Sequence, residues 1–155
     1  MKIYYLISFV VIALDQWTKS LAVTELANGF IKVTDFFSLI LAYNKGAAFS
    51  FLSDAGGWQR WFFTAVAVGV SAVLVVWIYR LKQHEKLLAI ALALVLGGAI
   101  GNVYDRIMLG HVVDFILVHY QDNYFPAFNI ADSAISVGAA LLILDAFLQG
   151  KKTGE

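Results

Sequence analysis

Long runs of apolar residues, separated by more polar segments, dominate the chain. A membrane-spanning helix takes about 20 mainly apolar residues. On this basis we expect transmembrane helices at Ile3–Val23, Trp61–Tyr79, Leu87–Tyr104 and Ile130–Leu148. Tryptophan and tyrosine gather near the ends of these runs, as they do at membrane–water interfaces. The pattern therefore predicts an all-α polytopic membrane protein with four transmembrane helices, forming one integral membrane domain over residues 1–155.

The first apolar run has a second interpretation, as a secretory signal peptide. Lys2 precedes the apolar stretch from Ile3 to Leu14, which is the layout of such a peptide. However, Asp15 and Lys19 interrupt the run, and no small-residue cleavage site follows an uninterrupted apolar core. We therefore expect a retained helix.

The basic residues predict how the helices are oriented, because short cytoplasmic segments carry an excess of Lys and Arg. The short polar segments hold Lys2, Arg80, Lys82, Lys86, Lys151 and Lys152. The two longer segments, 24–59 and 105–129, hold fewer and more widely spaced basic residues, namely Lys32, Lys45 and Arg106, with Arg60 directly after the first segment. Both termini should therefore be cytoplasmic, with the two longer segments on the outer side.

The two outer segments are expected to fold differently. Gly29–Phe51 is rich in Phe, Ile, Val, Thr and Tyr, which predicts a short β-hairpin or curled sheet resting on the membrane. In the second segment we expect a short interfacial helix around Val112–Tyr120, before Pro126 leads into the last transmembrane helix.

Composition excludes several classes of protein. The chain is 61% hydrophobic and 14% charged, whereas a soluble domain is about half apolar and a quarter charged. A net charge of zero with 11 basic residues argues against nucleic acid as a partner. Without cysteine, the chain has no disulfide framework, thiol nucleophile or thiolate metal site.

Nearly every strongly polar residue near the membrane runs falls in one layer, at the outer ends of the helices or in the outer segments. An ionisable group near hydrocarbon is costly and marks function by default. The members of this layer are Asp15, Lys19, Asn44, Asn102, Asp105, Arg106, Asp114, Asn129, Asp132 and Ser133. Two carboxyls brought close together share a proton unequally, because both cannot ionise cheaply. That is the electrostatic basis of an aspartyl protease, and Asp114 and Asp132 are the candidate pair.

Asp132 also has a structural interpretation, since an acidic residue in the first turn complements the helix dipole. Two features favour function instead. Asn129 is the better cap, and Asp132 leads a face of small residues formed by Ser136, Ala139 and Ala140.

Other polar and small residues are also open to structural readings. Asp15 and Lys19 lie four residues apart, and a structural ion pair is favoured over chemistry. Gly97, Gly98 and Gly101 most simply allow close approach of helices. Asn102 and Arg106 fit interhelical hydrogen bonding and substrate binding equally well.

Other chemistries fit the sequence less well. His111 and His119 bracket Asp114, yet their spacing matches no HExxH-type metal motif. Ser133 with Lys19 would suggest a Ser–Lys protease, but nothing aligns a base with a nucleophile. A proton-coupled transporter would need polar groups continuing to the inner side, which residues 69–76 and 87–96 do not supply. A scaffold protein would not explain the clustered carboxyls.

Five short motifs occur in a recognisable order along the chain. They are DQWTK at 15–19, NKGAAFS at 44–50, GGAIGN at 97–102 followed by DR at 105–106, VVDF at 112–115, and FNIADS at 128–133. In these motifs the chain resembles lipoprotein signal peptidase (signal peptidase II), a family of bacterial inner-membrane aspartyl proteases. Phe125 stands where the family often has Trp, a mild departure.

The resemblance implies that Asp114 and Asp132 are the catalytic pair. It also implies supporting or substrate-holding roles for Asp15, Asn44, Gly98, Asn102, Arg106 and Asn129; Lys19 and Asp105, which lie in the same motifs, complete the candidate site. The implied fold is four transmembrane helices with a periplasmic β-cradle and a short periplasmic helix. The implied substrate is a prolipoprotein with diacylglycerol on the cysteine that becomes the new N-terminus. Membrane lipids and the inhibitor globomycin are the other implied partners, and no metal or organic cofactor is required.

Overall fold

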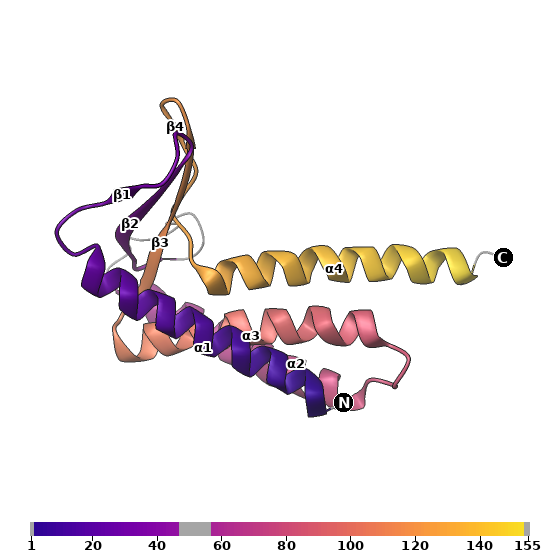
Figure 1. Cartoon of the computed structure of the whole chain (residues 1–155). Helices are drawn as coiled ribbons and strands as arrows, with labels where there is room; N and C mark the ends of the chain where they lie inside the picture. The colour runs from indigo at the N-terminus through magenta and orange to yellow at the C-terminus, as the bar shows by residue number, and fades with distance from the viewer. Residues whose placement is uncertain (1, 47–56, 154–155) are drawn as a thin grey trace.

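The computed structural model describes residues 2–46 and 57–153 of the chain (Figure 1). Its helices are α1 (Lys2–Glu25), α2 (Trp58–Arg80), α3 (Lys86–Met108) and α4 (Ile130–Thr153). Its strands are β1 (Ile31–Lys32), β2 (Phe37–Asn44), β3 (Val112–Tyr120) and β4 (Asn123–Tyr124). The helices run side by side, and the sheet lies across one end of the bundle (Figure 1). We call this end of the bundle the sheet end. The N- and C-termini lie at the opposite end of the bundle (Figure 1).

All four predicted spans are helices. Among the described residues, four helices are long and apolar enough to cross a membrane. Most helix ends extend a few residues beyond the predicted limits. For example, α3 continues past Tyr104 through Asp105 and Arg106 to Met108.

Helix α3 lies at the centre of the bundle and packs against the other three helices. Of its apolar window 56% is buried, against 28%, 17% and 11% for α1, α2 and α4. Glycines permit this packing: a Cβ added to Gly97 would lie 2.8 Å from the Ser8 carbonyl oxygen, and one added to Gly98 would collide with the Ala131 carbonyl. A Cβ on Gly101 would lie 2.7 Å from Oδ2 of Asp15. The prediction that these glycines allow close helix approach is confirmed.

The packing face of α4 differs from the predicted one. Ala131, Ala134 and Gly138 are buried, whereas the small residues Ser136, Ala139 and Ala140 are exposed. The proposed small-residue face led by Asp132 is therefore not the face that packs on α3. A Cβ on Gly138 would lie 2.8 Å from the Ala91 carbonyl oxygen, so Gly138 sets the approach of α4 to α3.

Side-chain hydrogen bonds add to the packing in the apolar part of the bundle. The Tyr5 hydroxyl donates to the Val75 carbonyl at 2.9 Å, and the Ser8 hydroxyl donates to the Ala93 carbonyl at 2.8 Å. Between helices surrounded by lipid there is little hydrophobic driving force, so such bonds and close packing hold the helices together.

The sheet joins the two outer segments. Its antiparallel order is β1-β2-β3-β4, and β2 pairs with β3 so that Ala42 faces Asp114 and Asn44 faces Val112. The predicted sheet in the first segment is confirmed for its described part. The predicted helix over Val112–Tyr120 is wrong, because this range is strand β3. Its sequence, VVDFILVHY, is rich in the β-branched and aromatic residues that favour strands, and β2 offers it a hydrogen-bonding edge.

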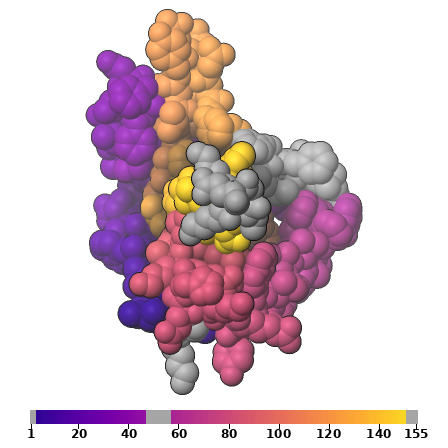
Figure 2. Space-filling model, turned by 90° about the vertical axis from the view of Figure 1, so that its right-hand side faces the viewer, coloured from indigo at the N-terminus to yellow at the C-terminus, as the bar shows by residue number. Residues whose placement is uncertain are grey.

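Seen along the helix axes, the sheet projects to one side of the bundle (Figure 2). Ala22 of α1 and Leu26, the residue after α1, pack against Phe115 of β3 in a small buried cluster, with Leu39 and Ile130 beside it. This cluster is the apolar joint that fixes the sheet on the helices.

The glycine packing makes a prediction with an internal control. Gly138→Ala should lower the melting temperature in detergent, because overpacking against the backbone of α3 costs about 1–3 kcal/mol. Gly69→Ala should leave the melting temperature unchanged or raise it, because a Cβ there meets nothing within 4 Å and Ala favours a helix by up to about 1 kcal/mol. Equal effects of the two substitutions on thermal unfolding would contradict the packing account.

Candidate active site

The polar residues predicted to form one layer do come together, at the sheet end of the bundle. They come from three helices and two strands: α1 supplies Asp15 and Lys19, α3 supplies Asn102, Asp105 and Arg106, β2 and β3 supply Asn44 and Asp114, and the start of α4 supplies Asn129 and Asp132. Asp15, Lys19, Asn102, Asp105, Asp114 and Asn129 are buried. Buried polar groups require hydrogen-bond partners, and these residues supply them to one another.

Asn129 binds both candidate aspartates. Its side-chain amide donates to Oδ1 of Asp114 at 2.7 Å, and its backbone N–H donates to Oδ2 of Asp132 at 3.3 Å. A single residue therefore brings the carboxyl of β3 and the carboxyl of α4 into one site.

Asn129 also caps α4. Its Oδ1 accepts the backbone N–H of Asp132 at 2.9 Å, while Asp132 returns a bond to the Asn129 N–H. This reciprocal pattern is a capping box, which confirms Asn129 as the helix cap and makes Asp132 its partner. The second oxygen of Asp132, Oδ1, accepts a hydrogen bond from the Asn102 amide at 2.8 Å.

Asp114 lies on β3 and is 3% exposed. Its Oδ2 accepts from the Asn44 amide at 3.2 Å, opposite the bond from Asn129. Burial and then the neighbouring charge of Asp132 raise the pKa of Asp114 from 3.8 to about 7, against opposing contributions from Asn44, Asn129 and Lys19. A carboxyl with such a pKa exchanges protons readily near neutral pH.

A second pair of carboxyls surrounds a buried cation. The Lys19 ammonium lies 2.7 Å from Oδ2 of Asp15 and 2.9 Å from Oδ2 of Asp105, and it donates to Oδ1 of Asn102 at 2.9 Å. The predicted ion pair of Asp15 with Lys19 is thus confirmed, and Asp105 extends it. No described residue forms an ion pair with Asp114 or Asp132, so the two pairs of carboxyls differ in their electrostatic surroundings.

The ion-paired carboxylates also hold the backbone beside the candidate aspartates. Oδ1 of Asp15 accepts the N–H of Ala131 at 2.9 Å, and Oδ2 of Asp105 accepts the N–H of Val113 at 3.1 Å. Ala131 immediately precedes Asp132, and Val113 immediately precedes Asp114. The Lys19 cluster therefore positions both candidate aspartates through their own main chain.

Asn102 connects the two clusters. Its oxygen accepts from Lys19 and, at 3.2 Å, from the Asn129 amide, while its nitrogen donates to Asp132.

Two further residues of α3 position the surrounding elements. Gly98, one turn before Asn102, brings the first turn of α4 against α3. Arg106 donates to the Asn102 carbonyl at 3.4 Å and to the Gly46 carbonyl at 3.1 Å. It thus ties α3 to the segment that follows β2, whose motif residues 47–50 lie outside the described residues.

Two supporting residues were not anticipated from the sequence. The Gln16 amide donates to Oδ2 of Asp15 at 3.1 Å and to Oδ1 of Asp105 at 2.9 Å; its place between Asp15 and Lys19 in the first motif was the available signal. Arg60 donates to the Arg106 carbonyl at 2.6 Å and to the Ile107 carbonyl at 2.8 Å. It thereby binds the last carbonyls of α3, which have no partner within the helix.

The two histidines lie in separate surroundings. His111 packs against Tyr43 with ring centroids 4.5 Å apart, whereas His119 packs against Tyr124 at 5.3 Å and lies 3.4 Å from the Ser38 hydroxyl. Among the described residues no group of three or more His, Cys, Asp or Glu side chains is placed to hold a metal ion.

Comparison with known proteins places the chain in a family. A family model described as signal peptidase (SPase) II matches residues 7–148. The chain belongs to the signal peptidase II family. Lipoprotein signal peptidases of Pseudomonas aeruginosa (strain UCBPP-PA14) and Pseudomonas fluorescens are 60% and 59% identical to it. These alignments cover 96% and 98% of this chain and 89% and 91% of the relatives.

The fold is shared with solved structures. A bacterial membrane enzyme solved by the in meso method at 2.3 Å resolution superposes with a TM-score of 0.87 and 30% identity, covering 100% of this chain and 93% of the other. A second bacterial membrane enzyme, at 1.9 Å, gives a TM-score of 0.77 and 31% identity over 93% of this chain and 92% of the other. As a signal peptidase II, the protein is a multi-pass membrane peptidase.

The Lys19 cluster generates a prediction about stability. Lys19→Met should lower the melting temperature of the purified protein strongly, because removing one partner of a buried ion pair costs about 3–5 kcal/mol. Lys32→Met serves as the control, since Lys32 pairs with Asp35 at 2.6 Å on the surface, where the side chains are 57% and 94% exposed. That variant should melt close to the wild type. A Lys19→Met protein as stable as Lys32→Met would show that the buried cluster contributes little.

Proposed function

We propose that this signal peptidase II is an aspartyl endopeptidase acting on diacylglyceryl-modified prolipoproteins. It removes the signal peptide on the N-terminal side of the lipidated cysteine. Relatives about 60% identical over most of the chain are lipoprotein signal peptidases, which supports lipoprotein processing as the activity. The observation that carries the aspartyl mechanism is Asn129, hydrogen-bonded to both Asp114 and Asp132.

In this mechanism one aspartate is ionised and takes a proton from water, while the other is protonated and donates to the scissile carbonyl oxygen. Attack of the water gives a tetrahedral gem-diol. The carboxyls then exchange roles, and a proton passes to the leaving amine. Acid–base catalysis of this kind contributes about 10²–10⁴-fold. The two carboxyls titrate as one unit rather than as separate groups.

The partners of the dyad suit this exchange of protons. Asp114 and Asp132 accept hydrogen bonds from the amides of Asn44, Asn102 and Asn129 and from no described lysine or arginine. A cation in direct contact would hold a carboxyl ionised, whereas a neutral amide binds it without fixing its charge. Asp15, Lys19 and Asp105 are then positioning residues, acting through the backbone of Ala131 and Val113 and through Asn102.

The location of the dyad suits a substrate anchored by lipid. Asp132 lies in the first turn of a membrane-spanning helix, so the scissile bond would be held at the level of the bilayer surface. Confinement of the substrate to this plane contributes to catalysis by positioning. We place the protein in the bacterial inner membrane with both termini cytoplasmic and the dyad near the periplasmic face, following the excess of basic residues between α2 and α3 and near the two ends of the chain. Globomycin is the expected inhibitor of this site.

The dyad assignment predicts the behaviour of three Asp→Asn variants. Asp114→Asn and Asp132→Asn should each lower cleavage of a diacylglyceryl-modified prolipoprotein by at least about 10²-fold. Asp145→Asn is the matched control, because Asp145 lies 13 residues further along α4, about 20 Å away, and should keep wild-type turnover. Substantial turnover by either dyad variant, with its melting temperature unchanged, would remove the assignment.

The wild-type rate should not change with EDTA, and EDTA-sensitive cleavage would instead indicate a metal mechanism.

A second prediction concerns pH. Because Asp114 has its pKa raised to about 7, the dyad should lose its shared proton, and cleavage should fall, as pH rises through about 7.

The same pKa predicts how stability depends on pH. The native state binds this proton more tightly than the unfolded chain, where the carboxyl titrates near 3.8. The stabilisation is therefore complete below about pH 4 and is lost as pH rises towards 7. Melting curves of the wild type and Asp114→Asn over this range test the point, since the substitution should flatten the dependence. Parallel pH profiles for the two proteins would contradict it.

A further inference from the structure

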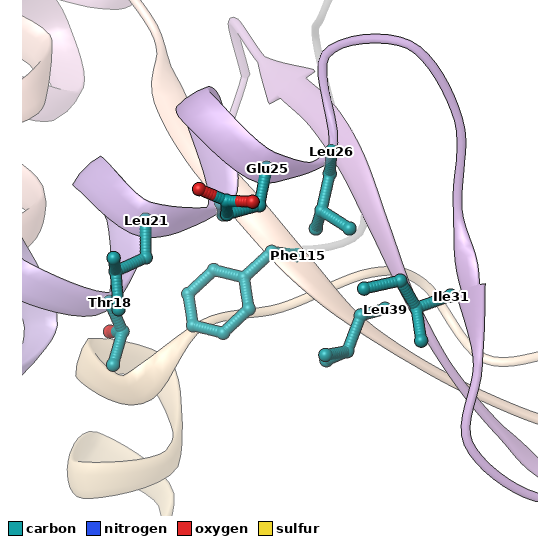
Figure 3. A pocket seen from close by; sticks show the side chains of 8 residues that line it. Thr18, Leu21, Glu25, Leu26, Ile31, Leu39 and Phe115 are labelled. Atoms are coloured by element: carbon teal, nitrogen blue, oxygen red, sulfur yellow. The ribbon is translucent and has the colours of Figure 1, made fainter.

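A cavity of about 280 Å³ lies at the joint between α1 and the sheet (Figure 3). We call it the joint pocket. Its apolar wall comes from the last two turns of α1, the residue after α1, and three strands, and it consists of Leu21, Ala22, Leu26, Ile31, Leu39 and Phe115. Thr18 and Glu25 complete the lining. No step of peptide hydrolysis proposed above uses this cavity.

The joint pocket lies behind the strand that carries Asp114. Asp114 and Phe115 are consecutive residues of β3, and consecutive side chains of a strand point to opposite faces of the sheet. Asp114 contacts Asn44 and Asn129 on one face, whereas Phe115 packs with Ala22 on the other. The pocket is thus separate from the place where the scissile peptide must lie.

The pocket continues the surface that α1 presents to the bilayer. Trp17 and Leu14 of α1 are 61% and 46% exposed, as expected for side chains covered by lipid. Leu21, 44% exposed, belongs both to this surface and to the pocket wall, and Ile31 on β1 is 49% exposed. Apolar side chains that line an open pocket gain van der Waals contacts when an apolar group packs against them. At the end of a membrane-spanning helix, the apolar group that is available to pack there is a lipid acyl chain.

The pocket lining includes one charged side chain. Glu25 ends α1 and is the single charged residue of the pocket lining (Figure 3). Glu25 belongs to none of the ion pairs among the described residues, which join Lys19 to Asp15 and Asp105 and Lys32 to Asp35. Its carboxylate repels an anionic headgroup and attracts a cationic one. The last residue of a membrane-spanning helix lies at headgroup level, so both halves of a lipid can be bound together.

We propose that the joint pocket binds one zwitterionic glycerophospholipid, with an acyl chain beside Phe115 and the headgroup ammonium on Glu25. The bound chain supports β3 from the face opposite Asp114. This site is distinct from the site that takes the substrate's own diacylglyceryl group, and it does not depend on the aspartyl mechanism.

Native mass spectrometry of the intact protein tests the proposal. The protein is taken from bilayer discs containing equal amounts of phosphatidylethanolamine and phosphatidylglycerol, and retained lipids are counted and identified. Wild type should retain one phosphatidylethanolamine per chain. Leu21→Trp, which places a larger side chain in the pocket wall, should lower retention at least about tenfold. Val23→Trp is the matched control: Val23 lies on the same helix, is 40% exposed and does not line the pocket, so retention should stay at the wild-type level.

Glu25→Lys tests the headgroup separately, and should change the retained lipid from phosphatidylethanolamine to phosphatidylglycerol. Retention of no lipid by wild type, equal retention of both lipids by wild type and Glu25→Lys, or equal losses in Leu21→Trp and Val23→Trp would each overturn the proposal. Added phosphatidylethanolamine should also raise the melting temperature of wild type more than that of Leu21→Trp, which guards against a folding defect in the variant. Because lipid binding is the readout, the result is independent of whether the dyad assignment holds.

Discussion

The structure depends on how charge is accommodated at the sheet end of an apolar bundle. A buried carboxylate is costly unless it is paired and hydrogen-bonded. Asp15 and Asp105 satisfy this requirement by sharing Lys19, and each also accepts a backbone N–H, from Ala131 and Val113 respectively. One buried cation on α1 thereby fixes the start of α4 and the start of β3, both of which are far from Lys19 in sequence. The geometry of the dyad follows from this cluster.

Four buried or half-buried aspartates therefore divide into two kinds. The pair around Lys19 is in direct contact with a cation and serves the architecture. Asp114 and Asp132 are surrounded by amides, which donate hydrogen bonds to a carboxyl without fixing its charge. Asn102 separates the two kinds, since its oxygen faces Lys19 and its nitrogen faces Asp132. A pair of acids can exchange a proton only where no cation holds either of them ionised, and the amide layer provides that condition.

The sequence predicted the four spans and the gathering of the polar residues, because hydropathy and the depth of a residue along a helix are read directly from the chain. It failed for Val112–Tyr120, where a strand was mistaken for an interfacial helix. The partner strand β2 lies some 70 residues earlier, and no local pattern shows that pairing. The packing face of α4 was also misjudged, because Gly138 rather than the Ser136 face meets α3. Small residues on two faces of one helix give no signal that chooses between them.

The error over β3 has a functional meaning. In a helix, consecutive side chains lie about 100° apart, so Asp114 and Phe115 would share much of the same environment. In a strand they point to opposite faces, and the same two residues can meet the amides of Asn44 and Asn129 on one side and an apolar cluster on the other. The apolar contact of Phe115 with Ala22 and Leu26 then holds the strand, while the polar face remains free for chemistry. Because β3 is a strand, Phe115 can anchor it to α1 through one face of the sheet, while the Asp114 carboxyl lies on the other face, outside the apolar cluster.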